Sequence, residues 1–427
     1  MLKVSFYNKG DSIEKVFEDR VIATPAQIEE DVDRIIENTK LNGDVALKEY
    51  SKLFDGIDIE DFIITRKELQ LAARKVSREV LNALKKAKEN IEKFHVKQKQ
   101  NSYVNFEEDG VFLGQRVLAI ENVGVYVPGG IAAYPSSVLM NVIPAKVAGV
   151  KNIIMVTPPS KTGRINPVIA AAAIIADIDC VYSIGGAQAI AALAFGTKSI
   201  PKVDKIVGPG NIYVATAKKK LYGVVDIDMI AGPSEILVIA DEGANPKYIA
   251  ADLLSQAEHD KMAASILVTT SESLCEEVNL EIENQLKVLD RKEIIQHSLE
   301  NYSKAIICES IDDAINVANE FAPEHLELMI QNPMEHFEKV KNAASVFLGY
   351  YTPEPVGDYF AGVNHVLPTN STARFFSPLS VDSFIKKMSF TYYTKDAINK
   401  NGKDIMLIAE KEGLLAHKNS IKVRMEK

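Results

Sequence analysis

The chain has 427 residues, of which 47% are hydrophobic and 25% are charged, a composition typical of globular proteins. This length exceeds what one simple hydrophobic core accommodates, so we expect two sizeable domains with smaller appendages. The net charge of −9 argues against nucleic acid as a partner, and no apolar run is long enough for a signal peptide or a membrane span. We therefore expect a cytoplasmic protein.

The N-terminal part, residues 1–110, is expected to form a helical region that packs on the core. Residues 66–100 carry apolar side chains at helical spacing in a highly charged background, which is typical of a solvated packing helix. His95 lies in this segment, and we expect it to be a surface residue, as we do for His336.

From about residue 111, short β-branched runs alternate with apolar helical stretches. Such alternation is typical of βαβ units around a mostly parallel sheet. It predicts an α/β protein with one doubly wound domain over residues 111–243, a second over 244–380, and a cleft between them. Residues 350–380 are rich in Pro, Gly, Thr and Ser and are expected to form a long functional loop. Residues 381–427 are expected to be helical.

The three cysteines lie far apart in the sequence and form no CxxC pair. Cys180 and Cys308 fall in strand-like runs, where a thiol usually behaves as a small core residue. The sequence therefore predicts neither a disulfide framework nor a thiolate zinc site.

Two glycine turns are candidates for binding phosphate or a nucleotide. Gly185-Gly186 and Gly208-Pro209-Gly210 each end a predicted strand and directly precede a predicted helix. A helix N-terminus presents free N–H groups to an anion, and glycine lets the anion approach the backbone. Neither turn has the GxGxxG pattern, and the same glycines would also suit ordinary tight turns. The sequence leaves open which turn would hold a pyrophosphate.

Gln256 and His259, in the segment LLSQAEHD, would share one face of a helix. They could be half of a metal site or ordinary surface residues. Asp358 in the Gly-rich loop is either an Asx-turn residue or a further ligand. With His417 these residues would give two nitrogen and two oxygen donors, a set that suits zinc or a similar divalent ion.

Glu324 and His325 follow Pro323, at what we expect to be the start of a helix. Adjacent helical residues do not share a face, so separate roles are more plausible than joint metal binding. The carboxylate suits a general base and the imidazole a proton shuttle. Helix capping would explain Glu324 but not His325.

Several of these segments resemble the signature stretches of one enzyme family, histidinol dehydrogenase. They are PGNIYVATAK, DMIAGPSEILVIAD, DLLSQAEHD, NEFAPEHLEL and GDYFAGVNHVLPT, and the similarity runs from about residue 20 to EGLLAH near the C-terminus. The resemblance implies a zinc-dependent, NAD-linked, four-electron oxidation of L-histidinol through L-histidinaldehyde to L-histidine, the final steps of histidine biosynthesis.

The resemblance also implies roles for individual residues. The implied zinc ligands, one ion per subunit, are Gln256, His259, Asp358 and His417. The implied acid/base pair is Glu324 and His325. The implied substrate contacts are Ser234, Gln256, His259, His325, Asp358, His365, Glu412 and His417. The implied NAD contacts are Tyr126, Gln188 and Asn211.

The fold implied by the resemblance has two incomplete Rossmann-like domains, in an aldehyde-dehydrogenase-like architecture, with small helical flanking domains. Two chains would form a homodimer in which the segment 381–427 reaches the partner's active site, so that Glu412 and His417 act there. No cysteine lies in the matching motifs, so a covalent thiohemiacetal route is not expected. Instead, Glu324 would activate water for aldehyde oxidation, His325 would act as acid/base, and zinc would orient the substrate.

Two other classes of protein fit the residues without the resemblance. A zinc hydrolase would use the metal ligands and Glu324 to activate water and would need no nucleotide. A non-enzymatic nucleotide-binding protein would use the glycine turns and keep the histidines as structural residues. Oxidation of histidinol by NAD⁺, tested with and without a chelator, separates the three classes.

Overall fold

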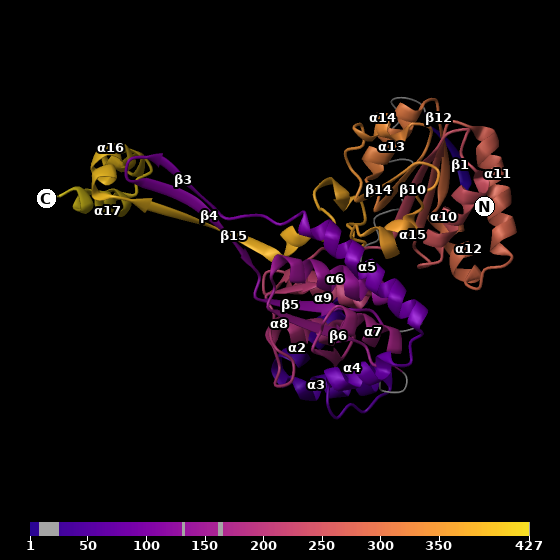
Figure 1. Ribbon diagram of the computed structural model, residues 1–427, viewed down its shortest axis with the longest axis horizontal. Helices are drawn as coiled ribbons and strands as arrows, with labels where there is room; N and C mark the ends of the chain where they lie inside the picture. Colours follow the sequence, from indigo (N-terminus) through magenta and orange to yellow (C-terminus); the bar gives the residue numbers. More distant parts are fainter. Residues whose placement is uncertain (8–24, 130–132, 161–164, 427) are drawn as a thin grey trace.

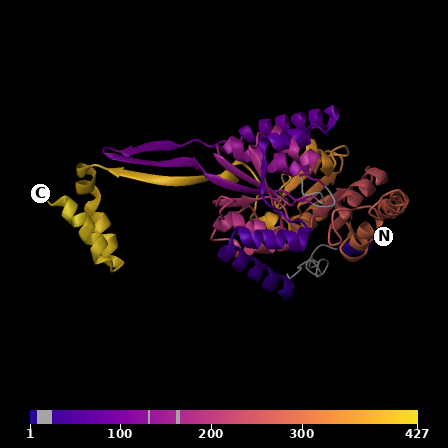
Figure 2. The same ribbon diagram turned by 90° about the horizontal axis from the view of Figure 1, so that it is seen from below.

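The computed structural model describes residues 1–7, 25–129, 133–160 and 165–426. It contains two α/β units and an arm that projects from the first unit to a pair of helices at the C-terminus (Figure 1). Viewed from below, the same arm extends well away from both units (Figure 2). Among the described residues, no helix is both long enough and apolar enough to cross a membrane.

The first unit is built on a six-stranded sheet in the order β2-β7-β6-β5-β8-β9, parallel except for β2. Its strands are β2 (Ile63–Thr65), β5 (Asn122–Tyr126), β6 (Asn152–Thr157), β7 (Cys180–Ser183), β8 (Lys205–Val207) and β9 (Asp226–Ile227). Its helices are α2 (Ala26–Asn42), α3 (Asp44–Tyr50), η1 (Ser51–Asp55), α4 (Arg66–Ala73), α5 (Arg78–Val96), α6 (Pro135–Ala148), α7 (Pro167–Ile175), α8 (Gly186–Phe195) and α9 (Ile212–Leu221).

The second unit is built on a six-stranded, all-parallel sheet in the order β1-β12-β11-β10-β13-β14. Its strands are β1 (Lys3–Tyr7), β10 (Glu235–Ala240), β11 (Ala264–Thr269), β12 (Lys304–Cys308), β13 (His325–Met329) and β14 (Ser345–Leu348). Its helical segments are α10 (Pro246–Ala257), α11 (Glu272–Leu286), α12 (Lys292–Asn301), α13 (Ile311–Phe321), α14 (Pro333–Phe337), α15 (Glu354–Val356), η2 (Gly357–Ala361) and η3 (Thr372–Arg374).

The arm is a three-stranded antiparallel sheet in the order β15-β4-β3. Its strands are β3 (Tyr103–Glu108), β4 (Val111–Ala119) and β15 (Ile385–Tyr393), and η4 (Val381–Phe384) leads into it. The helices α16 (Lys395–Lys411) and α17 (Leu415–Met425) pack on each other at its end (Figure 1).

The two units have the same strand topology, and their sheets confirm the predicted α/β class with parallel strands. In the first unit the chain steps outward from β5 to β6 and β7 and then returns to place β8 beside β5. In the second unit, β10, β11 and β12 step outward in the same way before β13 returns beside β10. Such reversals of strand order open a crevice at the carboxyl ends of the strands, where ligands commonly bind.

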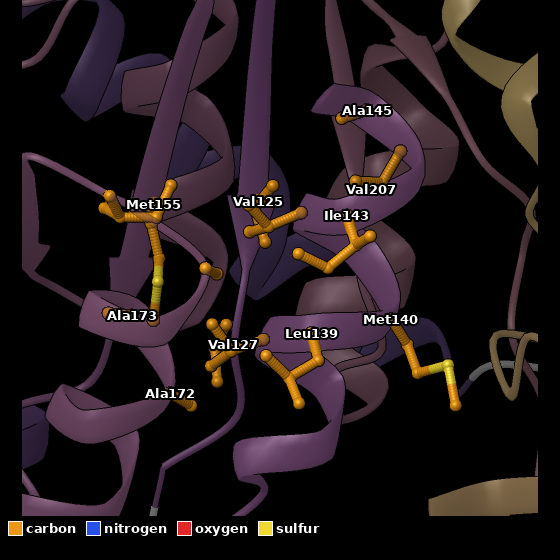
Figure 3. Packing of buried hydrophobic residues seen from close by; sticks show 14 of the residues in the cluster. Val125, Val127, Leu139, Met140, Ile143, Ala145, Met155, Ala172, Ala173 and Val207 are labelled. Carbon is orange, nitrogen blue, oxygen red and sulfur yellow. The ribbon is translucent and has the colours of Figure 1, made fainter. Parts of the chain in front are cut away.

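The core of the first unit shows why this alternating sequence forms layers. Val125 of β5, Met155 of β6 and Val207 of β8 point toward one side of the sheet, where α6 and α7 cover them with Leu139, Ile143 and small alanines (Figure 3). Alanine side chains in α7 and α8 let the helices lie close to the strands on both faces. This burial of apolar surface is the main favourable term in folding the unit.

Strand pairing assigns three segments differently from the boundaries expected from the sequence. β1 joins the second sheet although it begins the chain, and β4 and β15 pair with each other in the arm. The segment 381–427 is therefore not purely helical. These pairings join residues separated by hundreds of positions, and local periodicity carries no information about such partners.

Histidine 95 is buried, so the prediction of a surface position for it is wrong. Its Nδ1 lies 2.8 Å from the Ile91 carbonyl oxygen in α5, and its Nε2 lies 3.4 Å from the Asn364 amide nitrogen. A carbonyl only accepts, so Nδ1 carries the proton and Nε2 accepts from Asn364. His95 therefore anchors the loop that presents His365. The expected single helix over 66–100 is divided into α4 and α5.

Candidate active site

Glu324 and His325 lie at the start of a central strand of the second sheet. The prediction that they begin a helix is wrong, because His325 opens β13 between β10 and β14. The run HLELM is buried at every position, as in a strand covered on both faces. Helix capping therefore does not account for Glu324, whose Oε2 instead accepts a hydrogen bond of 2.9 Å from the Glu235 N–H.

The His325 imidazole is held in one tautomer. Its Nδ1 lies 3.0 Å from the Glu235 carbonyl oxygen, which only accepts, so Nδ1 donates. Its Nε2 lies 3.7 Å from Asp358 Oδ1 and 4.0 Å from Glu354 Oε1. This nitrogen is buried and has no hydrogen bond to any described residue. In the neutral ring Nε2 carries the lone pair, so it is the atom that can take or give a proton.

Glu354 belongs to this cluster and was not identified from the sequence. α15 and η2 bring Glu354 and Asp358 together with His325, and within the described residues these three form the group whose atoms could hold a metal ion. The signal was present, because two carboxylates four positions apart share one side of a helical turn. The surrounding prolines and glycines had instead predicted an irregular loop.

Burial and mutual charge set the protonation of the cluster. Burial raises the pKa of Glu324 to about 7 and, together with the Asp358 charge, that of Glu354 to about 8. Burial alone would raise the pKa of Asp358, but the interaction with the nearby His325 imidazole and the charge of His365 lower it to about 2. Burial acts to lower the pKa of His325, yet Glu324 and Asp358 raise it to about 10. Asp358 is therefore the permanent anion of the site.

A buried pair of carboxyl groups, Asp252 and Glu327, lies next to the cluster and holds Glu354 in place. Asp252 of α10 interacts with Glu327, which lies two residues after His325 and so on the same face of β13. Glu327 Oε1 accepts a 2.7 Å hydrogen bond from the Glu354 N–H. Burial raises the pKa of both Asp252, to about 6, and Glu327. The pair therefore favours a shared proton and fixes the position of α15.

Gln256 has the properties of a ligand rather than of a surface residue, whereas His259 beside it is exposed. Gln256 lies one turn after Asp252 on α10, is buried, and neither polar atom of its amide is hydrogen-bonded within the described structure. His259 follows the end of the helix, with its N–H 3.2 Å from the Gln256 carbonyl oxygen. Desolvation lowers the pKa of His259, and the charge of Asp358 opposes this shift. Such orphaned polar atoms call for a partner.

His365 and Ser234 connect the cluster to its surroundings. His365 Nδ1 lies 3.1 Å from the Asp358 carbonyl oxygen and 3.9 Å from its carboxylate, and Nε2 lies 3.5 Å from Ser137 Oγ. Because Ser137 lies in the first turn of α6, the cluster borders the first unit. Ser234 directly precedes β10, and its carbonyl oxygen accepts the Ala264 N–H. The candidate site thus lies at the amino ends of β10 and β13.

Glu412 and His417 are not brought to the cluster within one chain. Glu412 follows the last residue of α16 and His417 lies in α17, and these helices sit at the end of the arm, far from the strands β10 and β14 that flank β13 (Figure 1). There they line a cavity of about 600 Å³ between α16 and α17, together with Ile405, Ile408, Ala409, Ala416, Ser420 and Ile421.

A larger cavity of about 860 Å³ lies at the carboxyl ends of the first sheet and contains all three predicted NAD contacts. Tyr126 ends β5, Gln188 lies in the first turn of α8, and Asn211 caps α9. The Gly186 N–H lies 3.2 Å from the Tyr126 hydroxyl, and Gly185 and Gly186 line the cavity. The residues Gly208 to Gly210 do not line this cavity, and their turn affects it only by positioning the next residue, Asn211, which does.

Comparison with known proteins identifies the family. The family model "Histidinol dehydrogenase" matches residues 19–425. The histidinol dehydrogenase of Clostridium acetobutylicum is 58% identical over 401 residues, covering 94% of this chain and 93% of the relative. That of Lactococcus lactis is 51% identical and covers 100% of both chains. The crystal structure of histidinol dehydrogenase from Elizabethkingia anophelis superposes with a TM-score of 0.94 at 43% identity, covering 99% of this chain and 98% of that one. The chain therefore belongs to the histidinol dehydrogenase family, NAD-dependent oxidoreductases of histidine biosynthesis.

Proposed function

We propose that this chain is a cytoplasmic enzyme that oxidises L-histidinol through L-histidinaldehyde to L-histidine, passing two hydrides in turn to NAD⁺. The observation that carries the proposal is the buried acid/base cluster at the start of β13. There the unpartnered His325 Nε2 lies beside Asp358, and Glu324 occupies the adjacent position. The family supplies the substrate, and the cluster supplies the groups that its chemistry requires.

The residues present fit one zinc ion. Gln256 offers an amide oxygen without a partner, His259 an imidazole near Asp358, and Asp358 a carboxylate that stays ionised. Oxygen and nitrogen donors of this kind suit zinc, and His417 from a second chain would complete four protein ligands. When bound, zinc supplies a Lewis acid that anchors and orients the substrate's nitrogen atoms.

The first oxidation requires a base for the hydroxyl proton while hydride leaves the adjacent carbon. His325 Nε2 suits this role, because the Glu235 carbonyl holds the ring with Nε2 directed into the site. In the free protein the carboxylates around His325 favour its protonated form. A cation at Asp358 would neutralise one of these carboxylates and so make the neutral ring more accessible.

The second oxidation requires water to add to the aldehyde, because the resulting hydrate again carries a transferable hydride. Glu324 suits the base for that water. Burial raises its pKa to about 7, near the pH at which a general base is most effective. The cysteines lie elsewhere, at Cys180 in β7, Cys275 in α11 and Cys308 in β12, which agrees with a route without a thiol adduct.

The cavity at the first sheet suits NAD. Gly185 and Gly186 place the N-terminus of α8 in its wall, and this positive end of the helix dipole suits a pyrophosphate. Asn211 Oδ1 already accepts from the N–H groups of Tyr213 and Val214, so its amide N–H groups are what it offers a ligand. NAD supplies the hydride acceptor when it is bound.

A homodimer would bring the remaining residues to the site. Glu412 and His417 end an arm that reaches away from their own chain's cluster (Figure 2). Ile408, Leu414 and Leu415 nearby are exposed, as expected for a surface that another chain covers. We infer that each arm crosses to the second copy and delivers His417 to the partner's Asp358.

The experiment is to incubate the purified protein with L-histidinol and NAD⁺ and to follow NADH by absorbance. We expect two NADH per histidinol, with L-histidine as the product. Removal of metal by a chelator should abolish turnover, and zinc should restore it. Failure of the fully metallated protein to form NADH would refute the proposal, and hydrolysis of an ester or amide without NAD⁺ would favour a zinc hydrolase.

A further inference from the structure

One wall of the cofactor cavity comes from α2, the end of α3 and η1, outside the residues that the family resemblance implied. The residues that form it are Asp31, Arg34, Ile35, Tyr50, Leu53, Phe54 and Asp55. Leu53, Phe54 and Asp55 are consecutive in η1, a π-helical turn that ends at Gly56. Turns of this type are rare and often occur at functional sites.

Asp55 has a binding group with no partner in the protein. Its Oδ2 is buried and accepts no hydrogen bond from any described residue, and burial raises the pKa of the carboxyl. An ionised carboxylate only accepts hydrogen bonds, so a ligand must bring donors to it. Leaving a buried acceptor unpaired is costly, so a ligand that supplies O–H groups gains affinity there.

The charge on this wall opposes a phosphate. Of the described residues that line the cavity, three are charged, namely Asp31, Arg34 and Asp55. The Arg34 guanidinium is already paired with Asp31, which lies one helical turn earlier in α2. The wall therefore carries a net negative charge, and the one cation among these described residues, Arg34, is 75% exposed and paired with Asp31.

We propose that Asp55 selects NAD over NADP by accepting hydrogen bonds from the hydroxyls of the adenosine ribose. A phosphate on that ribose would replace a donor with negative charge and meet repulsion. The inference rests on the proposed function for the cofactor, and it adds the residue that decides between two closely related cofactors. In Rossmann-type sites an acidic residue binds the ribose hydroxyl in the same way and disfavours the 2′-phosphate, but that residue follows the glycine-rich turn in the sequence, whereas Asp55 precedes it.

The cavity places the parts of the dinucleotide consistently with this role. Gly185 and Gly186 suit the pyrophosphate. Leu53 and Phe54 are 71% and 55% exposed and offer an apolar surface to the adenine. The Asp55 carboxylate also lies near enough to Tyr126 to contribute, after burial, to the raised pKa of that phenol. The adenosine ribose lies between adenine and pyrophosphate, and among the charged residues of the wall Asp55 is the one with a buried, unpartnered oxygen to offer it.

The test compares Asp55→Asn and Asp55→Ser with the wild type, using NAD⁺ and NADP⁺ with saturating histidinol. We expect the KM for NAD⁺ to rise roughly 10- to 100-fold, the loss of a hydrogen bond to a charged group, with kcat and the KM for histidinol little changed. The relative kcat/KM for NADP⁺ should rise. Asp58→Asn is the matched control, because Asp58 lies three residues away, is 78% exposed and pairs with Lys52.

Calorimetric titration with ADP-ribose and with its 2′-phosphorylated form measures the same preference without turnover. The wild type should bind ADP-ribose more tightly, and both Asp55 variants should reduce the difference. Unchanged preference in folded variants would overturn the assignment of Asp55, whether or not the protein turns over. If the wild type shows the preference but oxidises no histidinol, the function fails and the role of Asp55 stands.

Discussion

Replacing Lys218 by Met tests whether a buried ion pair holds the turn that presents Asn211 to the cofactor cavity. Lys218 and Asp228 side chains are only 3% and 1% exposed and are paired with each other. Lys218 Nζ also donates to the Gly208 carbonyl oxygen at 3.0 Å, and Asp228 Oδ2 accepts from the Gly208 N–H at 2.8 Å. The pair therefore holds Gly208 from both sides.

The backbone at Gly208 also packs tightly against a neighbouring strand. Its φ is +110°, and a Cβ placed on it would lie 2.1 Å from the Tyr126 carbonyl oxygen. The turn thus packs directly against the end of β5, three residues before Asn211. Any shift of the turn changes the position of Asn211 in the cavity.

The expected loss follows from the buried charge that the variant leaves behind. Removing one partner of a buried pair costs about 3–5 kcal/mol, because the other charge stays desolvated. For a unit of this size, each kcal/mol shifts the midpoint by about 2–4 °C, so Lys218→Met should melt roughly 6–20 °C lower. Thermal unfolding followed by circular dichroism measures the shift. The KM for NAD⁺ should also rise, with the KM for histidinol unchanged.

Lys219→Met is the matched control. Lys219 is its neighbour on α9, is 53% exposed, and lies 3.8 Å from Glu29, so its loss should cost less than about 1 kcal/mol. Adding Asp228→Asn to Lys218→Met should recover part of the stability, because the unpaired carboxylate is then neutral. Equal losses for Lys218→Met and Lys219→Met, or a double variant as unstable as the sum of its parents, would refute the reasoning.

Three further predictions concern the cluster at β13. Glu324→Gln should slow aldehyde oxidation more than alcohol oxidation, and the wild-type aldehyde step should quicken as the pH rises through about 7, where Glu324 loses its proton; equal loss in both steps, measured with each substrate, would contradict this role. Glu327 has a raised pKa in the folded state, so its stabilising contribution is complete below its unfolded pKa and is lost as the pH rises through the folded value. The metal-free wild type should therefore lose up to about 1.4 kcal/mol per pH unit relative to Glu327→Gln over that range, and parallel unfolding curves across pH would argue against the buried shared proton. Mixing His417→Ala with Glu324→Gln subunits should restore some activity if the site is shared, whereas a mixture no better than either parent would count against the crossing arm.

The sequence by itself determined the class of the fold and supplied the candidates for the catalytic groups. Alternating β-branched runs and apolar helices predicted two parallel α/β units, and the structure confirms them. The segment around Glu324 and His325 predicted an acid/base pair, and this role stays a prediction, while the helix predicted there is a strand. The fold prediction succeeded because the local hydrophobic period is written directly in the chain, and candidate groups could be named because a residue's chemical type is written there too.

Only the tertiary structure decided which distant groups share an environment. In the folded chain His95 is buried, and Glu354 lies in the cluster with His325 and Asp358. β1 pairs into the second sheet, and His417 lies in α17 at the end of the arm. Each outcome depends on strand pairing or on desolvation by residues far away in the sequence. The pKa of Glu324 shows the reason most clearly, because the same carboxyl would titrate normally in water and is changed by the burial that the surrounding fold imposes.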